Sequence, residues 1–398
     1  MAGRIRRLLL LAIPSALITT LLGASGVELW VRSTWDARKG RPGFFLSDPV
    51  RGQRLAAGYD GWFAGVPVHI NSLELRDTRE YSLEKRPNTF RILVLGDSVT
   101  FGHGSVYEHT YPYLLEQHLR EWQPGIDWQV WNAAVPGYNT SQELAYLLEV
   151  GGRFRPDLVV VGFYNNDLFD NRPVRSAGRW QRAVARVESW IRIHLYSFEF
   201  YKRVYLTMRW QISRQKQDRL RAEHVDTEQQ LLSVTDLTKA PEQRLTAFDR
   251  LTDDQVRGFD CVEGMKPHAD AIQRMQSDPG FQPWMDAVNG FKQVARGGDF
   301  RIVFFLNDAP AICGTEPESD FFYDGGTAAE DRFYLQALGT ELSPVSTYDA
   351  FMHTTPSQMP AAGGHSLGNA NAVKAEVLFD FLRTRVPAAS AALSRSDR

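Results

Sequence analysis

The sequence predicts an α/β protein: a three-layer α/β/α domain with a five-stranded parallel sheet, preceded by a helix that spans a membrane. Two patterns lead to this prediction. From residue 89 onward, short apolar runs alternate with amphipathic segments, which is typical of a parallel sheet covered by helices on both faces. Near the N-terminus, residues 8–27 form an apolar run of the length that crosses a bilayer.

The N-terminal 31 residues are interpreted as a signal anchor or a signal peptide. Arg4, Arg6 and Arg7 precede the apolar run, and such a basic flank stays in the cytoplasm, so the rest of the chain faces outward. Small residues at 23–26 offer a cleavage site, but apolar character continues to Val31, which favours an uncleaved anchor. We therefore expect a membrane-anchored, periplasmic or cell-surface protein, with a secreted form after cleavage as the alternative.

The remaining chain is divided by its patterns into a lead-in, a main domain and a tail. Residues 32–88 predict a small β-rich lead-in, residues 89–388 the α/β domain, and residues 389–398 a disordered tail. In the domain, the helix at 140–154 is expected to open with a capping box formed by Thr140 and Glu143. The expected strands are 90–97, 128–135, 157–164, 300–308 and 344–351, and the expected helices include 111–122, 140–154 and 369–386.

Between the third and fourth strands lies a helical insertion at about 170–298. Its first part, 172–223, holds 13 Lys or Arg and only 4 Asp or Glu, with aromatic and aliphatic residues at helical spacing. Two interpretations are open. The favoured one is helices that pack on the core and present a basic face to solvent; the other is a surface that rests on anionic lipid next to the anchor.

The overall composition limits the classes of partner and cofactor that we expect. The 398 residues are 43% hydrophobic with a formal net charge of -2, so the chain folds as one large or two smaller domains and nucleic acid is not an expected partner. Cys261 and Cys313 are too few for a disulfide scaffold or a Cys-rich zinc site, and they are either bridged to each other or two buried thiols. We expect no metal and no organic cofactor.

Three polar positions follow predicted strands, at the edge where parallel sheets bind ligands. Ser98 follows LVLGD, Gly137 lies in the turn AVPGYN, and Asn166 follows VVVGFYN. A serine at a helix start exposes its hydroxyl, and backbone or amide N–H groups can hold a developing oxyanion. Taken singly, each has a plainer interpretation: a helix N-cap, a turn glycine and a loop asparagine.

A base for the serine should be a histidine. His365 lies in a glycine-rich loop directly before the last helix, from which it can reach across the sheet edge toward Ser98. We expect the intervening loop and helix to carry His103 and His109 away from Ser98. His353 is an alternative that the spacing leaves open.

Together these segments resemble the SGNH hydrolases, also called the GDSL esterase/lipase superfamily. The matching stretches are RILVLGDSVTFG, NAAVPGYNTSQE and VVVGFYNND, with a weaker match in GGHSLGNANAVKAEVLFDFL. The resemblance implies a flavodoxin-like SGNH fold, with Ser98 as nucleophile and His365 as base. It also implies an oxyanion hole made by the N–H groups of Ser98 and Gly137 and the side chain of Asn166. Asp97 and Asp167 would then hold loop backbones.

One feature departs from this family pattern. The family usually places an aspartate two or three residues before the histidine, where this chain has Gly363 and Ala362. Three explanations are open: a Ser–His dyad with a backbone carbonyl orienting the imidazole, an orienting acid from elsewhere such as Asp349 or Asp308, or a loss of hydrolysis.

The resulting functional prediction is an extracytoplasmic, membrane-anchored serine esterase that hydrolyses O-acyl esters. Its partners would be an acylated small molecule, glycan or lipid of the cell envelope, and the membrane through the N-terminal helix. An O-acyltransferase would use the same site with a sugar hydroxyl in place of water. A catalytically inactive domain that binds glycan or a partner is the third hypothesis. The oligomeric state is not predicted.

Overall fold

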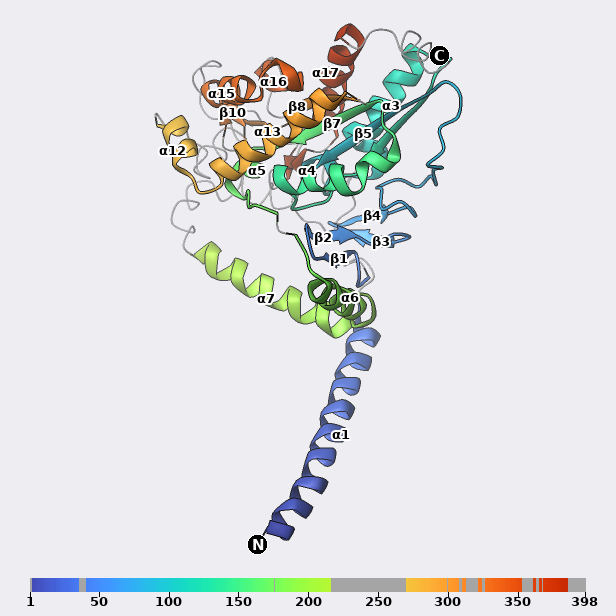
Figure 1. The fold of residues 1–398 in the computed structure, drawn as a ribbon, viewed down its shortest axis with the longest axis vertical. Helices are drawn as coiled ribbons and strands as arrows, with labels where there is room; N and C mark the ends of the chain where they lie inside the picture. The colour runs from blue at the N-terminus through green and yellow to red at the C-terminus, as the bar shows by residue number, and fades with distance from the viewer. Residues whose placement is uncertain are drawn as a thin grey trace, which may run out of the picture.

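The computed structural model contains a long N-terminal helix, a pair of helices at its end, two small β-hairpins and an α/β domain (Figure 1). The structure describes residues 2–35, 41–174, 176–215, 270–298, 300–307, 310–312, 321–323, 326–352, 361–362, 365–366 and 368–385. Cys261, Cys313, Asp308 and His353, named above, lie outside these ranges, as do the residues expected to form the tail.

The elements before the α/β domain are one helix and two hairpins. Helix α1 (Ala2–Thr34) contains one segment, Ala12–Thr34, that is long and apolar enough to cross a membrane. The two antiparallel hairpins pair β1 (Phe45–Asp48) with β2 (Gly52–Leu55) and β3 (Asp60–Phe63) with β4 (Val66–His69).

The α/β domain is built around a five-stranded, all-parallel sheet, which confirms the predicted fold class. Its strand order is β12-β8-β7-β5-β6. The strands are β5 (Thr89–Gly96), β6 (Asp127–Asn132), β7 (Leu158–Phe163), β8 (Arg301–Leu306) and β12 (Val345–Ser346). The helices are α2 (Ser98–Phe101), α3 (Tyr111–Trp122), α4 (Thr140–Glu149), α5 (Asn166–Phe169), α6 (Arg179–His194), α7 (Tyr196–Gln215), α12 (Ala271–Ser277), α13 (Phe281–Gly297), α15 (Ala328–Leu338), α16 (Tyr348–Met352) and α17 (Asn369–Arg385). Short strands complete the described part: β9 (Pro310–Ile312), β10 (Phe321–Tyr323), β11 (Gly326–Thr327), β13 (Ala361–Ala362) and β14 (His365–Ser366).

The unbroken apolar runs of the central strands arise because both sheet faces are covered. In β5, Leu93 and Leu95 point to one face and join a core with residues of α4, α13 and α15, whereas Ile92 and Val94 point to the other and join α3 and α17. Successive side chains of a strand alternate between faces, so each strand feeds both cores. The result is the three-layer arrangement that the sequence predicts.

Two local expectations differ from the structure. The fifth strand, expected at 344–351, has only two residues, and α16 follows it directly. Helix α4 is capped by Asn139, whose capping box is completed by Gln142 rather than by Thr140 and Glu143. The observed capping box lies one residue before the expected one. Glu143 is therefore not a capping group, and its side chain is buried.

Candidate active site

Strand β5 ends in a tight connection that places Ser98 at the sheet edge. Gly96 has a positive φ of 154°, and a Cβ at this position would lie 2.2 Å from Thr100 Oγ1, so the connection accepts only glycine. The Asp97 side chain caps α2 by accepting the N–H of Val99 at 2.8 Å. The side chain of Ser98 is half-buried. Because Ser98 is the first residue of α2, its own N–H has no acceptor within the helix.

The structure brings Ser98 and His365 together across 267 positions of sequence. His365 begins β14, and its Nε2 lies 2.8 Å from Ser98 Oγ, the hydrogen-bond distance that a general base needs. The next residue, Ser366, is anchored from two sides, because its carbonyl accepts hydrogen bonds from Ser105 Oγ at 3.3 Å and from Asn371 Nδ2 at 3.0 Å. The short strand that carries the imidazole is therefore attached to the loop after α2 and to α17.

The expectation that His103 is carried away from Ser98 is wrong. The chain turns back after α2, and the His103 N–H donates to the Ser98 carbonyl at 3.0 Å. The imidazole of His103 then stacks on that of His365, with ring centroids 4.4 Å apart and planes inclined by 25°. The edge-to-face ring of Phe63, 5.2 Å away, contacts His103 in turn. The flanking Gly102 and Gly104, both with positive φ, were the sequence signal for this reversal.

Gly137 and Asn166 lie on the two loops that flank Ser98. Strands β6 and β7 are the neighbours of β5 on either side, and Gly137 (φ 82°) lies in the turn after β6, while Asn166 is the first residue of α5 after β7. The turn is held in place because Gln53 Nε2 of β2 donates to the Pro136 carbonyl at 2.6 Å. All three predicted oxyanion positions thus leave the carboxyl edge of adjacent strands.

Of the two candidate orienting acids, Asp349 and Asp308, the structure describes only Asp349. Asp349 lies on α16 with an exposed side chain, and its negative charge acts on Asp331, where burial and this charge raise the pKa to about 6. Asp308 lies outside the described residues. A role for either acid in orienting His365 stays a prediction.

Two buried carboxyl groups, those of Asp97 next to Ser98 and of Glu143 on α4, have raised pKa values. Burial raises the pKa of Asp97 to about 6, although hydrogen bonds from the Val99 and Thr100 N–H groups and the charge of Lys374 oppose the shift. Burial, and then the charge of Asp97, raise the pKa of Glu143 well above its usual range. Both Glu143 carboxyl oxygens are buried and accept no hydrogen bond from the residues that the structure describes, so the neutral form of this side chain is favoured.

A buried arginine from the lead-in holds the loop that follows α2. Arg76 donates to the carbonyls of Phe101, of Gly102 at 2.8 Å and of Ser105 at 2.5 Å. Its guanidinium lies 4.5 Å from the Phe101 ring centroid, and complete burial lowers its pKa to about 9. The sequence gives no signal for this role, because an arginine in a β-rich segment shows no sign that it will be buried.

In the described ranges, no group of three His, Cys, Asp or Glu side chains is close enough to hold a metal ion.

Comparison with known proteins gives a family match over the part of the chain that contains Ser98, Gly137 and Asn166. Residues 94–256 match the GDSL-like Lipase/Acylhydrolase family, and no curated protein sequence matches the chain. Similar solved structures include TesA (13% identity, 74% of this chain and 98% of that chain, TM-score 0.35) and a putative acylhydrolase from Bacteroides fragilis NCTC 9343 (10%, 75% and 88%, 0.31). A mutant of Axe2, an acetyl-xylooligosaccharide esterase from Geobacillus Stearmophilus, is also similar (10%, 74% and 94%, 0.28). The segment that contains Ser98, Gly137 and Asn166 is thus similar to the GDSL-like Lipase/Acylhydrolase family.

Proposed function

We propose that this protein is a membrane-anchored, extracytoplasmic serine esterase that hydrolyses O-acyl esters of an envelope glycan or lipid. The observation that supports it most directly is the 2.8 Å separation between His365 Nε2 and Ser98 Oγ. Nucleophile and base are within hydrogen-bond reach of each other.

In the proposed reaction, Ser98 Oγ attacks the ester carbonyl while His365 Nε2 accepts the hydroxyl proton. The negative charge that develops on the carbonyl oxygen is stabilised by the N–H groups of Ser98 and Gly137 and by the Asn166 side chain, which together supply fixed donors. The imidazolium returns its proton to the departing alcohol, leaving an acyl-Ser98 ester. Water, deprotonated by His365, then attacks this ester, and the free acid leaves as Ser98 regains its proton.

The location outside the cytoplasm rests on α1 and its basic N-terminal flank. An enzyme held at a membrane meets substrates of the envelope, which is why we assign the ester to an envelope glycan or lipid.

Replacing the nucleophile tests the chemistry. We expect Ser98→Ala to lower kcat for a short-chain p-nitrophenyl ester by about 10³-fold or more, and to abolish covalent labelling by a fluorophosphonate probe. Ser277→Ala, at an exposed serine on α12, is the matched control and should retain full activity. Undiminished turnover by Ser98→Ala would refute the assignment. Transfer of the acyl group to a glycan hydroxyl in preference to water would identify an acyltransferase, and an unlabelled wild-type protein would indicate a binding domain.

A further inference from the structure

Helices α6 and α7 expose two apolar stripes that the α/β domain does not cover. On α6 the stripe consists of Trp180, which is 79% exposed, followed at intervals of four, three and three residues by Val184, Val187 and Trp190. On α7 the exposed apolar side chains are Phe198, Tyr201, Val204, Tyr205 and Met208. Intervals of three and four place these residues on one side of each helix. An exposed apolar surface of this extent marks an interaction site.

The other side of α6 is already packed, so the stripe is not free to turn inward. Ala185 is buried, the Ser47 hydroxyl donates to Glu188 Oε2 at 2.6 Å, and the Ser47 N–H donates to Ser189 Oγ at 3.1 Å. These contacts fix α6 on β1 and direct the stripe away from the protein.

Helix α7 begins at the point where α1 changes from apolar to polar. The N–H groups of Tyr196 and Ser197 both donate to the Glu28 carboxylate at 2.9 Å, and the ring of Phe200 lies 5.8 Å from that of Trp30. A charged residue and a tryptophan at the end of an apolar helix are typical of the membrane–water interface. Figure 1 shows α6 and α7 together at this end of α1, with α7 extending sideways from it.

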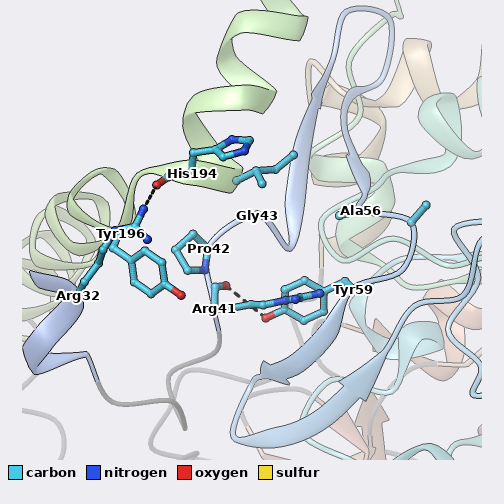
Figure 2. A pocket seen from close by; sticks show the side chains of 10 residues that line it. Arg32, Arg41, Pro42, Gly43, Ala56, Tyr59, His194 and Tyr196 are labelled. Carbon is cyan, nitrogen blue, oxygen red and sulfur yellow. Dashed lines mark hydrogen bonds between the residues drawn. The ribbon is translucent and has the colours of Figure 1, made fainter. Parts of the chain in front are cut away.

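The same region is positively charged. Helix α6 carries Arg179, Arg182, Arg186 and Arg192 against the single acid Glu188, and the first three arginines are exposed beside the apolar stripe. Next to α6, a cavity of about 360 Å³ is lined by Arg32, whose guanidinium is paired with the Glu28 carboxylate at 2.7 Å, and by Arg41. Figure 2 shows these two arginines beside Tyr196 and Tyr59, respectively.

We propose that α6 and α7 lie on the outer surface of the bilayer that α1 enters, with their apolar stripes in the headgroup region and the arginines of α6 on anionic lipid phosphates. Amphipathic helices with tryptophan on one side and arginine at its border bind membranes in this way. This inference rests on the proposed anchoring by α1 and is independent of the esterase chemistry.

This contact would also fix how the active site is oriented to the membrane. The Ser47 N–H of β1 donates to Ser189 Oγ of α6, and β1 pairs with β2. Gln53 of β2 in turn donates to the carbonyl of Pro136, the residue before Gly137. A short chain of contacts therefore joins the proposed lipid-facing helix to a loop of the active site.

The test uses the full-length chain in nanodiscs containing a lipid with a photoactivatable headgroup, in phosphatidylcholine alone or mixed with phosphatidylglycerol. Cross-linked peptides are identified by mass spectrometry. We expect peptides of α6 and α7 to be labelled at least about fivefold more than the α4 peptide containing the exposed Leu148, and labelling to rise with phosphatidylglycerol. Trp180→Ser with Val187→Ser should reduce the labelling, whereas the matched control Leu148→Ser should not. Arg179→Gln with Arg182→Gln and Arg186→Gln should remove the dependence on phosphatidylglycerol.

Strong labelling of α1 with only background labelling of α6 and α7 would overturn the inference and leave the anchoring intact. Absence of label from all three helices would instead refute the anchoring, and this inference with it. A dimer in which α6 and α7 cross-link to a second copy and stay unlabelled by lipid would also overturn it.

Discussion

At the scale of single residues, the site contains a second histidine that stacks on the proposed base. The His103 and His365 rings are 4.4 Å apart, and the usual aspartate before the histidine is replaced by Gly363 and Ala362. A stacked ring restricts the tilt of the imidazole, which is one of the tasks that an orienting acid performs. We interpret His103 as a positioning residue.

This interpretation predicts a difference between two substitutions of His103. His103→Ala should lower kcat by about fivefold with little change in KM, since an aromatic pair contributes about 1 kcal/mol. His103→Phe keeps a flat ring and should stay close to the wild type. Steady-state kinetics on a short-chain ester measure both, with His118→Ala on α3 as the control. Equal kcat for His103→Ala and the wild type would contradict the interpretation.

Glu143 gives a prediction for the dependence of stability on pH. Burial raises the pKa of Asp97 from 3.8 to about 6 and that of Glu143 well above 4.5. Both groups bind protons more readily in the folded state, so their stabilising contribution is complete below pH about 4 and is lost as pH rises through 6 and beyond. Glu143→Gln mimics the protonated acid. It should match the wild type near pH 4 and be more stable by about 1–3 kcal/mol at pH 8.

Urea unfolding of the two proteins at a series of pH values measures this difference. A difference in the free energy of unfolding that stays constant from pH 4 to 8 would show that folding does not raise the pKa of Glu143.

At the scale of elements, the lead-in is part of the active site's support. Arg76 donates hydrogen bonds to three carbonyls of the loop after α2. Phe63 of β3 packs on His103, and Gln53 of β2 donates to the turn before Gly137. Each of these side chains comes from a segment that precedes the α/β domain in sequence. The hairpins therefore contribute to the geometry of the loops that carry the candidate site residues.

Replacing Arg76 tests this role. Arg76→Met removes the guanidinium donors of three buried carbonyls and should lower the free energy of unfolding by about 2–3 kcal/mol, and kcat should fall as well because the loop carries His103. Arg296→Met, which removes an exposed ion pair with Glu341, should cost less than about 1 kcal/mol and leave kcat unchanged. Urea unfolding and ester hydrolysis of the two variants distinguish a specific role of Arg76 in supporting the site from the general effect of removing a positive charge. An Arg76→Met enzyme with normal kcat would refute the role.

At the scale of the whole molecule, the described elements are arranged in a line from the apolar helix α1 to the α/β domain (Figure 1). Helix α1 ends at α6 and α7, α6 carries the first hairpin, and the hairpins contact the loops at the carboxyl edge of the sheet (Figure 1). A protein with this arrangement presents its site at a defined height and orientation above the bilayer, provided that α6 and α7 rest on the lipid as proposed.

The sequence by itself determined the parallel sheet, most of its flanking helices and the position of Ser98. These features depend on periodicity and on residues within a few positions of one another, such as the apolar run before Gly96 and the cap formed by Asp97. Two local predictions from the sequence were wrong. The cap of helix α4 was misplaced because several residue types can cap a helix, and the fifth strand was predicted too long because a two-residue strand leaves almost no pattern.

Only the tertiary structure decided what surrounds Ser98. The approach of His365 across 267 positions, the stacking of His103, and the burial of Arg76 and Glu143 depend on how loops from different strands and hairpins pack together. Burial and close contact between distant segments set both the hydrogen bonds and the pKa values of these groups. A pattern that repeats every two or four residues carries no information about either.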